Sequence, residues 1–541
     1  MRRLARYLAP RQALRPAAAW LVIGVLAALL VRHFWNDEGE LPNIPFTLGV
    51  TGALVSFVVF LSRRGMVATV LVSALVVLIV AAATAKHAIM NMVVHAYDLF
   101  FYFSSWSTVS YLWADQRRYL LAGLAAALAA MAIVWLAWHL DSTRSRRAWA
   151  AAALAAFGLL TWYMQFYYSN LYLSSFYASW GETLEALWRG ALLEAAPEGF
   201  AAKPFTIPTN CQTASKPPHI ILIHQESVVQ PSLFTQLRYD HSVDPFFLSA
   251  DGSLHPMRVE TYGGASWLTE FSLLAGVSTH AFGGMRQFVQ TFTQNKLKDT
   301  LPQALARCGY RNVVFYPMLK NFVSNDRFYT SIGLREIFDL EAQGAKSAHE
   351  RDRFYYGNAM AEMAKHLAKS DKPMFTYIQT MSAHWPYNYT YEPEMKVPGG
   401  GAGVDPEMHE YLRRLSIAKI AYDCLLAERH HPRAPRTLLG FFQETEAEDV
   451  ILDDQSIGFI TYYAVQGINY RVPPLPQYTT LDVPYIGTLM LELAGLPLSD
   501  SHRERKRLME LCKGRYHSCA QRAQILQFHR RLIDSGVMAA R

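Results

Sequence analysis

The sequence predicts an α/β protein in two parts, with five membrane helices followed by a mostly parallel α/β sandwich outside the membrane. Three observations support this fold class. Five long apolar stretches lie in the first 167 residues, arginine is distributed unevenly between them, and short apolar runs alternate with helical patterns after residue 217. A chain of 541 residues is also too long for one ordinary domain.

Each apolar stretch has close to the ~20 residues that a helix needs to cross a bilayer. The first is too apolar, and too closely followed by others, to be only a cleaved signal peptide. Residues 1–167 are therefore predicted to form a five-span transmembrane domain, with spans near 17–35, 44–61, 66–85, 119–140 and 148–167.

The flanking arginines predict the direction in which the chain crosses the membrane, because cytoplasmic segments are enriched in Lys and Arg. The N-terminal tail carries five arginines and no acid, and further arginines follow at 63–64 and 144–147. Arg32, Arg117 and Arg118 oppose the pattern. A cytoplasmic N-terminus and five crossings place everything after residue 168 on the outer side.

The net charge of +7 owes much to these loops and gives little support for a nucleic-acid partner. All five cysteines lie in the second part of the chain. The spacing of Cys512 and Cys519 suits a small disulfide loop in an oxidising compartment. The odd number leaves at least one thiol unpaired, which the sequence does not identify.

Strand–helix alternation after residue 217 favours a mostly parallel sandwich. The run HIILIHQES reads as a buried strand that delivers Glu226 at its carboxyl end, where ligands collect in open α/β sheets. Strands are also expected at 311–317, 373–380 and 436–442, and helices at 300–308, 356–369 and 408–429. The expected segments are a connector at 168–217 with a helix near 179–195, an α/β domain at 218–510 and a helical tail at 511–541.

The stretch TYGGASWLTEFSLLAG at 261–276 places Ser266 in the first turn of a helix. Free backbone N–H groups and the helix dipole favour anions at such a position. A hydroxyl beside a bound phosphate is a candidate nucleophile if its pKa is lowered. The alternative is an ordinary N-cap serine.

The motifs HQES, GGASWLTEFSLLAG, NFVSNDRFYTSIGL, TMSAHWPY and DVPYIGTLMLELAGLPLS occur in this order. Over residues 218–500 this order resembles the sulfatase/alkaline-phosphatase superfamily. The five preceding spans match its membrane-anchored branch of lipoteichoic acid synthases, phosphoglycerol transferases and phosphoethanolamine transferases. The resemblance implies a sulfatase-like external domain. It also implies that Glu226 is a metal ligand, Ser266 a nucleophile that touches the metal, and His384 a group that contacts the phosphoryl group or transfers a proton.

One departure concerns the metal, which the resemblance implies to be Zn or Mn. Family members carry an Asp-His pair after the strand equivalent to 436–442, where this chain has Gln443, Glu444, Thr445 and Glu446. Glu444 can replace the Asp, whereas Thr445 cannot replace an imidazole. Either the metal site is weakened or another histidine completes it, the possibilities being His224, His430 and His431.

The remaining expected site residues concern the substrate. Asn325 stands near the place of an arginine that grips phosphate in some relatives, with Lys320 and Arg327 close by and Trp385 beside His384. Lys86, at the end of the third span, is a possible counter-charge for a lipid phosphate. The alternative is a snorkelling lysine beside an aromatic interface belt.

Two functions fit these residues. The first is transfer of a phospholipid headgroup, phosphoglycerol or phosphoethanolamine, to an envelope glycan or lipid through a phosphoseryl intermediate. The second is a catalytically degenerate relative that binds an envelope polymer or a synthase partner. Both imply a multi-pass protein of the bacterial inner membrane with its C-terminal domain in the periplasm.

Overall fold

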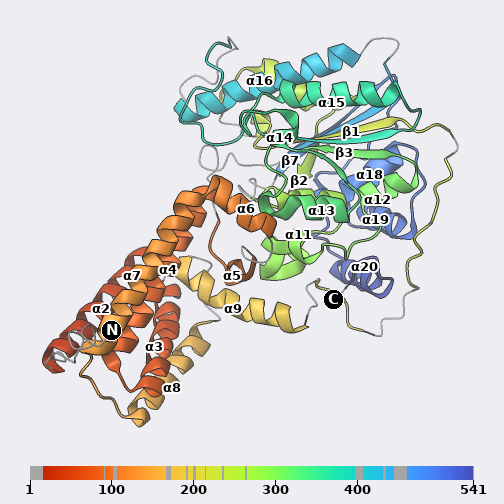
Figure 1. Ribbon diagram of the computed structural model, residues 1–541. Helices are drawn as coiled ribbons and strands as arrows, with labels where there is room; N and C mark the ends of the chain where they lie inside the picture. The colour runs from red at the N-terminus through yellow and green to blue at the C-terminus, as the bar shows by residue number, and fades with distance from the viewer. Residues whose placement is uncertain are drawn as a thin grey trace. The chain divides into compact units, whose positions relative to one another are not determined.

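The computed structural model divides the chain into two compact units, Met1–Trp188 and Arg189–Arg541 (Figure 1). The structure describes residues 16–39, 41–90, 92–101, 106–165, 172–189, 193–198, 203–213, 215–233, 237–261, 265–395, 406–429, 434–443 and 460–539.

The first unit contains a helix at each of the five predicted spans. These helices are α2 (Pro16–Asp37), α3 (Asn43–Ser62), α4 (Gly65–Met90), α7 (Arg117–Leu140) and α8 (Arg147–Met164). Four of them, α2, α3, α4 and α7, are long and apolar enough to cross a membrane. The fifth, α8, has 18 residues. The short helices α5 (Asp98–Phe101) and α6 (Trp106–Asp115) lie between α4 and α7.

Two buried acidic groups inside the first unit, Glu38 and Asp98, have partners within it. The Glu38 carboxylate accepts hydrogen bonds from the first N–H groups of α9 (Tyr172–Arg189), at 2.8 Å from Leu173 and 3.2 Å from Ser174. The dipole of α9 favours a negative charge at this end. Lys86 forms a buried ion pair with Asp98 at 2.7 Å. This partner already balances the charge of Lys86, so a role toward a lipid phosphate stays a prediction.

The second unit is built on a mixed sheet that has eight strands within the described residues, in the order β4-β3-β5-β1-β6-β7-β2-β8. The four predicted strands are β1 (His219–Gln225), β3 (Arg311–Phe315), β5 (Met374–Thr380) and β6 (Thr437–Gln443), and they are adjacent and parallel. The sequence did not reveal β2 (His255–Arg258), β4 (Glu336–Phe338), β7 (Ile460–Ile468) and β8 (Leu481–Asp482). Among these eight described strands, β7 alone runs antiparallel to its neighbours. The mostly parallel α/β prediction is confirmed.

Helices cover both faces of the sheet around β1 (Figure 1). Ile221 and Ile223 pack in a core with residues of α15 (Asp352–Leu367) and α16 (Pro406–Arg429). On the opposite face, Leu222 approaches β6 at Gly440. A Cβ at Gly440 would come within 3.0 Å of the Met490 sulfur on α18 (Ile486–Leu493), so glycine permits this layer to close. The sheet is therefore covered on both faces, as buried parallel strands require.

The other described elements of this unit complete the two layers. The helices are α10 (Trp267–Ala275), α11 (Val289–Phe292), α12 (Leu301–Arg307), α13 (Asn325–Ser331), α14 (Leu340–Gln343), α19 (Asp500–Leu511) and α20 (Arg522–Asp534). Short 3-10 turns occur at Pro231–Leu233, His241–Phe247, Thr279–Phe288, Phe322–Ser324 and Val483–Tyr485.

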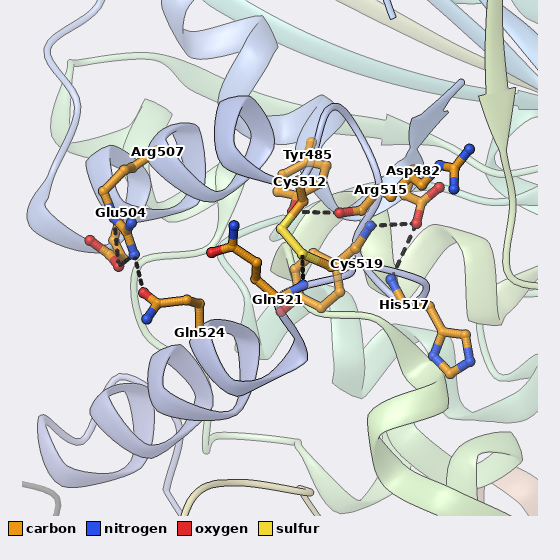
Figure 2. Close-up of a disulfide and its surroundings, with 11 residues drawn as sticks. Asp482, Tyr485, Glu504, Arg507, Cys512, Arg515, His517, Cys519, Gln521 and Gln524 are labelled. Carbon is orange, nitrogen blue, oxygen red and sulfur yellow. Dashed lines mark hydrogen bonds and ion pairs between the residues drawn. A yellow bond between two sulfur atoms is a disulfide. The ribbon is translucent and has the colours of Figure 1, made fainter. Parts of the chain in front are cut away.

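Two disulfides join segments of the second unit. The predicted Cys512–Cys519 bridge is confirmed. It closes a loop whose Tyr516 and His517 N–H groups donate to the Asp482 carboxylate at 2.6 and 3.2 Å (Figure 2). The second bridge joins Cys211 to Cys308 across 97 residues, and Cys424 is the free thiol. The C-terminal loop is thus attached to the end of β8.

Replacing both cysteines of the long bridge, in Cys211→Ser/Cys308→Ser, should lower the free energy of unfolding by about 2–5 kcal/mol, because a long loop gains much entropy when it opens. The measurement is the urea midpoint of the full-length protein in detergent. Cys424→Ser is the control and should leave the midpoint unchanged. Equal midpoints for all three proteins would show that the long bridge contributes no stability.

Candidate functional site

Strands β1, β3, β5, β6, β2 and β8 all point the same way, so their carboxyl ends lie at one edge of the sheet. Ligands of open α/β sheets bind at this edge. Glu226 directly follows β1, the loop with His384 follows β5, and Ser266 lies between β2 and α10.

Glu226 is buried and held from two sides. Its N–H group donates to Thr380 O at 3.0 Å, which extends the β1–β5 pairing by one residue. Its Oε1 accepts a hydrogen bond from the Gln379 side-chain amide, and its Oε2 lies 3.6 Å from Nε2 of His384. The parallel register therefore fixes one carboxylate oxygen and directs the other toward His384.

The orientation of the His384 ring follows from its other nitrogen. Nδ1 lies 2.6 Å from the carbonyl oxygen of Trp385, and because a carbonyl only accepts, Nδ1 carries the proton. In the neutral ring, Nε2 then presents a lone pair toward Glu226. Two acceptors at this separation favour a shared proton or a shared cation between them. The pair can therefore deliver a proton or hold a metal.

Ser266 occupies the N-cap position of α10 and is partly exposed. Its φ and ψ angles are −48° and −29°, and its side chain makes no capping hydrogen bond. Ser266 therefore does not cap the helix through its hydroxyl, as an ordinary N-cap serine would. The hydroxyl makes no hydrogen bond to the first N–H groups of α10.

Four of the ten non-glycine residues with a positive φ angle among the described residues lie next to expected site residues. Positive φ angles occur at Ser227 (58°), Ala265 (60°), Val323 (43°) and Ser324 (62°). These positions directly follow Glu226, directly precede Ser266 and lie just before α13. Each costs roughly 1–3 kcal/mol, and such strain is typical of functional sites.

A buried polar network lies beneath this edge. Glu270, one turn after Ser266 on α10, accepts hydrogen bonds from Tyr329 of α13 and, at 3.0 Å, from Gln290. Burial raises the pKa of Glu270 to about 7. Burial also lowers the pKa of His224, against the attraction of Glu226 and Glu270, and its Nδ1 lies 3.0 Å from the Tyr377 hydroxyl. The network ties α10 to β1, β5 and α13.

Arg414 of α16 holds the loop that presents His384. The fully buried guanidinium donates to the carbonyls of His384 at 2.7 Å and Pro386 at 2.9 Å, and its Nε donates to Glu410 at 2.9 Å. It also lies over the ring of Tyr389 at 4.6 Å. Arg414 is therefore a positioning residue that the sequence did not reveal, because nothing in a helical pattern says which arginine turns inward.

The other expected substrate residues lie in different environments. Lys320 and Arg327 are exposed near the start of α13, and Trp385 is 49% exposed. Asn325 is buried, and its Oδ1 has no hydrogen-bond partner in the part of the chain that the structure describes. A buried acceptor of this kind favours a ligand that brings a donor. The substrate roles of these residues stay predictions.

A Zn or Mn ion fits the described residues in part. Glu226 and His384 offer one oxygen and one nitrogen donor that face each other, and both types suit Zn. Within the described ranges, no group of three His, Cys, Asp or Glu side chains could hold an ion. Glu444, Thr445, His430 and His431 lie outside the described residues. A complete site would therefore need Ser266 and the segment after β6.

Comparison with known families agrees with this arrangement. The family model described as sulfatase matches residues 233–417, which include Ser266 and His384. The chain carries a sulfatase-family domain. The resemblance inferred from the order of the motifs is therefore confirmed. Glu226 and Glu444 fall outside the matched segment, so for Glu226 the support comes from the geometry at the sheet edge.

Relatives of known sequence or structure are distant. An uncharacterized protein of Haemophilus influenzae is 26% identical over 317 residues, or 55% of this chain and 54% of that protein, so the match spans about half of the relative's length. The phosphoglycerol transferase GacH of Streptococcus pyogenes, solved with sn-glycerol-1-phosphate, is 14% identical over 61% of this chain and 88% of that chain, with a TM-score of 0.50. The phosphoethanolamine transferase EptA of Neisseria meningitidis is 11% identical over 88% and 97%, with a TM-score of 0.49. The likeness to GacH shows the shared fold.

Arg414→Met should release the loop that carries His384, because the carbonyls of His384, Pro386 and Tyr389 lose their donor. Arg413→Met is the matched control, since Arg413 also pairs with Glu410 at 2.9 Å but does not reach His384. Removing one partner of a buried ion pair costs roughly 3–5 kcal/mol, so both variants should be less stable. Only Arg414→Met should change the fluorescence of Trp385 in the folded protein, measured against a Trp385→Phe background. The same change in both variants would contradict a positioning role.

Proposed function

We propose that this protein transfers a phospholipid headgroup, phosphoglycerol or phosphoethanolamine, to a hydroxyl of an envelope glycan or lipid. The observation that carries the proposal is the Glu226–His384 pair, 3.6 Å apart at the carboxyl edge of a sulfatase-family sheet. The strained Ala265–Ser266 turn at the N-terminus of α10 supports it, because helix N-termini favour phosphate.

In the first step, Ser266 Oγ attacks the phosphorus of the donor headgroup. The bond from phosphorus to the diacylglycerol oxygen breaks, and a phosphoseryl enzyme forms while diacylglycerol leaves with a proton. Nε2 of His384, in the loop that Arg414 holds, takes the proton of the Ser266 hydroxyl and delivers it to the departing diacylglycerol oxygen. In the second step, an acceptor hydroxyl attacks the phosphoseryl phosphorus and gives its proton to Nε2 of His384, which returns it to Ser266 Oγ as the phosphoseryl bond breaks.

Glu226, Ser266 and Glu444 would hold a divalent metal, Zn or Mn, at this edge. When bound, the ion would lower the pKa of the serine hydroxyl and neutralise phosphoryl charge. Lys320, Arg327 and Trp385 are proposed to contact the headgroup. This chain has threonine at position 445, where the family resemblance implies a histidine ligand.

The apolar helices of the first unit explain how a lipid donor would be reached. A membrane-anchored domain works on a substrate that remains in the bilayer, and Lys86 is proposed as a contact for lipid phosphate. Two disulfides in the second unit support an oxidising compartment. We infer a bacterial inner-membrane protein whose catalytic domain lies in the periplasm.

A second function is favoured by one observation, the threonine at position 445 where the family resemblance implies histidine. A chain that cannot hold the metal would keep the fold and bind an envelope polymer or a synthase partner. Catalysis and binding are separated by the experiments that follow.

Ser266→Ala should abolish headgroup transfer from a fluorescent phospholipid in vesicles, a loss on the order of 10³-fold or more for a nucleophile. His384→Ala should lower kcat by about 10²–10⁴-fold with a smaller change in KM, as expected for an acid–base group. Ser272→Ala, on the same helix, is a control for the fold. If Ser266→Ala retains the wild-type rate, Ser266 is not the nucleophile.

Thr445→His should raise the affinity of the full-length protein for Zn or Mn by about tenfold or more, because substitutions at or next to metal ligands typically change metal affinity by about 10–100-fold. The measurement is metal content after dialysis at a fixed free concentration. Thr445→Ala should leave the content unchanged, and Glu226→Gln should abolish it. Wild-type protein without metal and without transfer activity would favour the binding function.

A further inference from the structure

A large groove lies at the opposite, amino edge of the sheet. Its volume is about 640 Å³, within the range of ligand-binding sites. Arg311 and Glu336 are the first residues of β3 and β4, whereas the site described above follows the last residues of the strands. The groove is lined by Ile207, Lys298, Asp299, Gln303, Ala306, Arg307, Tyr310, Arg311, Asn312, Thr330, Ser331, Gly333, Arg335 and Glu336.

The charge of this lining is positive, because four cationic side chains face two acidic ones. Arg311 is balanced by Glu336 at 2.9 Å and by Glu362 at 2.8 Å. Lys298 and Arg335 are exposed and form no ion pair within the described residues. These two cations remain available to an anionic ligand.

A third cation, Arg307, is fixed in place. It pairs with the buried carboxylate of Asp299, which also accepts hydrogen bonds from the hydroxyls of Ser499 and Ser501. The Asp299 carbonyl lies 3.1 Å from Nε2 of His502. Since Asp299 is held by α19, the guanidinium of Arg307 is oriented before any ligand arrives, which lowers the entropy cost of binding.

The lining of the groove includes a buried hydrogen-bond acceptor without a partner in the described residues, Oδ1 of Asn312. Asn312 donates from Nδ2 to the carbonyls of Pro302 at 2.7 Å and Gly333 at 3.2 Å. Its Oδ1 has no hydrogen-bond partner in the described residues, although the residue is only 8% exposed. The Thr330 and Ser331 hydroxyls, which also line the groove, donate to the carbonyls of Asp326 and Phe328, so their oxygens can still accept hydrogen bonds from a ligand. Such a lining suits a ligand rich in hydroxyl groups more than an apolar peptide or an acyl chain.

A second cavity of about 330 Å³ adjoins the groove and shares Arg307 with it. The segment 206–212 contributes to both cavities, through Ile207 on one side and Thr206 and Pro208 on the other. This segment is tied down by the Cys211–Cys308 bridge and by a 2.9 Å hydrogen bond from Thr206 N–H to Asp500. Arg503, which pairs with Asp500, also lines this cavity. Two adjoining cavities suit an extended ligand.

We propose that the two cavities bind an anionic oligosaccharide, a chain of sugars bearing phosphate, sulfate or carboxylate groups. The hydroxyls match the amide- and hydroxyl-rich lining, and the anionic groups match Lys298, Arg335 and Arg307. The identification of this oligosaccharide as the envelope acceptor rests on the proposed function, whereas the binding of an anionic oligosaccharide does not. The groove would hold the polymer at the edge opposite to Ser266, so a chain would remain attached while its growing end reaches the carboxyl edge.

The experiment uses full-length protein in phosphatidylcholine nanodiscs and a fluorescent dextran sulfate oligosaccharide, followed by anisotropy. Lys298→Glu/Arg335→Glu should weaken binding by about tenfold, because two exposed attractions become repulsions. Arg238→Glu/Arg471→Glu is the control, since it changes the charge equally at exposed arginines that line neither cavity. Neutral dextran of the same length should bind more weakly than dextran sulfate, and inorganic polyphosphate should bind more weakly per charge.

Several outcomes would overturn the proposal. These are no binding of dextran sulfate, equal weakening in the two double variants, or equal binding of polyphosphate, which would indicate simple attraction of polyanions. Ser266→Ala separates the two proposals. Suppose that Ser266→Ala binds dextran sulfate as the wild type does, and that neither protein transfers a headgroup. The proposed binding site would then be supported, and the proposed catalytic function would fail.

Discussion

The parallel pairing of β1 with β5 on one side and β6 on the other is the constraint on which the rest of the second unit depends. All seven residues of β1 are buried, and its aliphatic side chains each contribute roughly 1.5–3 kcal/mol by leaving water. The register places Ile220 opposite Phe375 and Leu438. Because this register brings the ends of β1 and β5 together, Glu226 meets Gln379 and His384 instead of solvent.

The site is positioned by buried charges more than by its own loops. Arg414 and Glu410 lie in α16, yet they decide where His384 points, and Glu270 fixes α10 relative to β1 and α13. Buried ion pairs contribute little net stability but specify one arrangement when every polar group has a partner. The loops themselves carry left-handed residues at Ser227 and Ala265, and only the packing of the surrounding sheet and helices maintains this strain.

The two edges of the sheet differ in chemistry. At the carboxyl edge the Glu226 carboxylate faces the His384 imidazole, and Ser266 lies in the loop between β2 and α10. An acid, an imidazole and a hydroxyl suit reaction at a phosphoryl centre. The amino edge gathers cations, amides and hydroxyls around a groove that the Cys211–Cys308 bridge helps to shape, which suits retention of an anionic chain. One domain can thereby separate the holding of a polymer from chemistry at its end. The apolar helices of the first unit would confine this domain to the surface on which a lipid donor lies.

The sequence alone determined the features that follow from local pattern. Span length and apolar composition located α2, α3, α4, α7 and α8, and continuous apolar runs located β1, β3, β5 and β6. The spacing of Cys512 and Cys519 located one disulfide, and the order of the motifs indicated the family. These predictions succeeded because each depends on a few adjacent residues. Strands β2 and β8 were missed because they are only four and two residues long.

Only the tertiary structure decided which distant residues meet. The pairing of Cys211 with Cys308, the contact of Arg414 with the His384 carbonyl and the hydrogen bond of Asn312 to the Gly333 carbonyl join residues that are 97, 30 and 21 positions apart. No local pattern encodes such pairs, since they are set by the order of strands in the sheet and by which face of a helix turns inward. The sequence could indicate that Glu226 ends a strand and that His384 follows one. The fold decided that these two strands are neighbours.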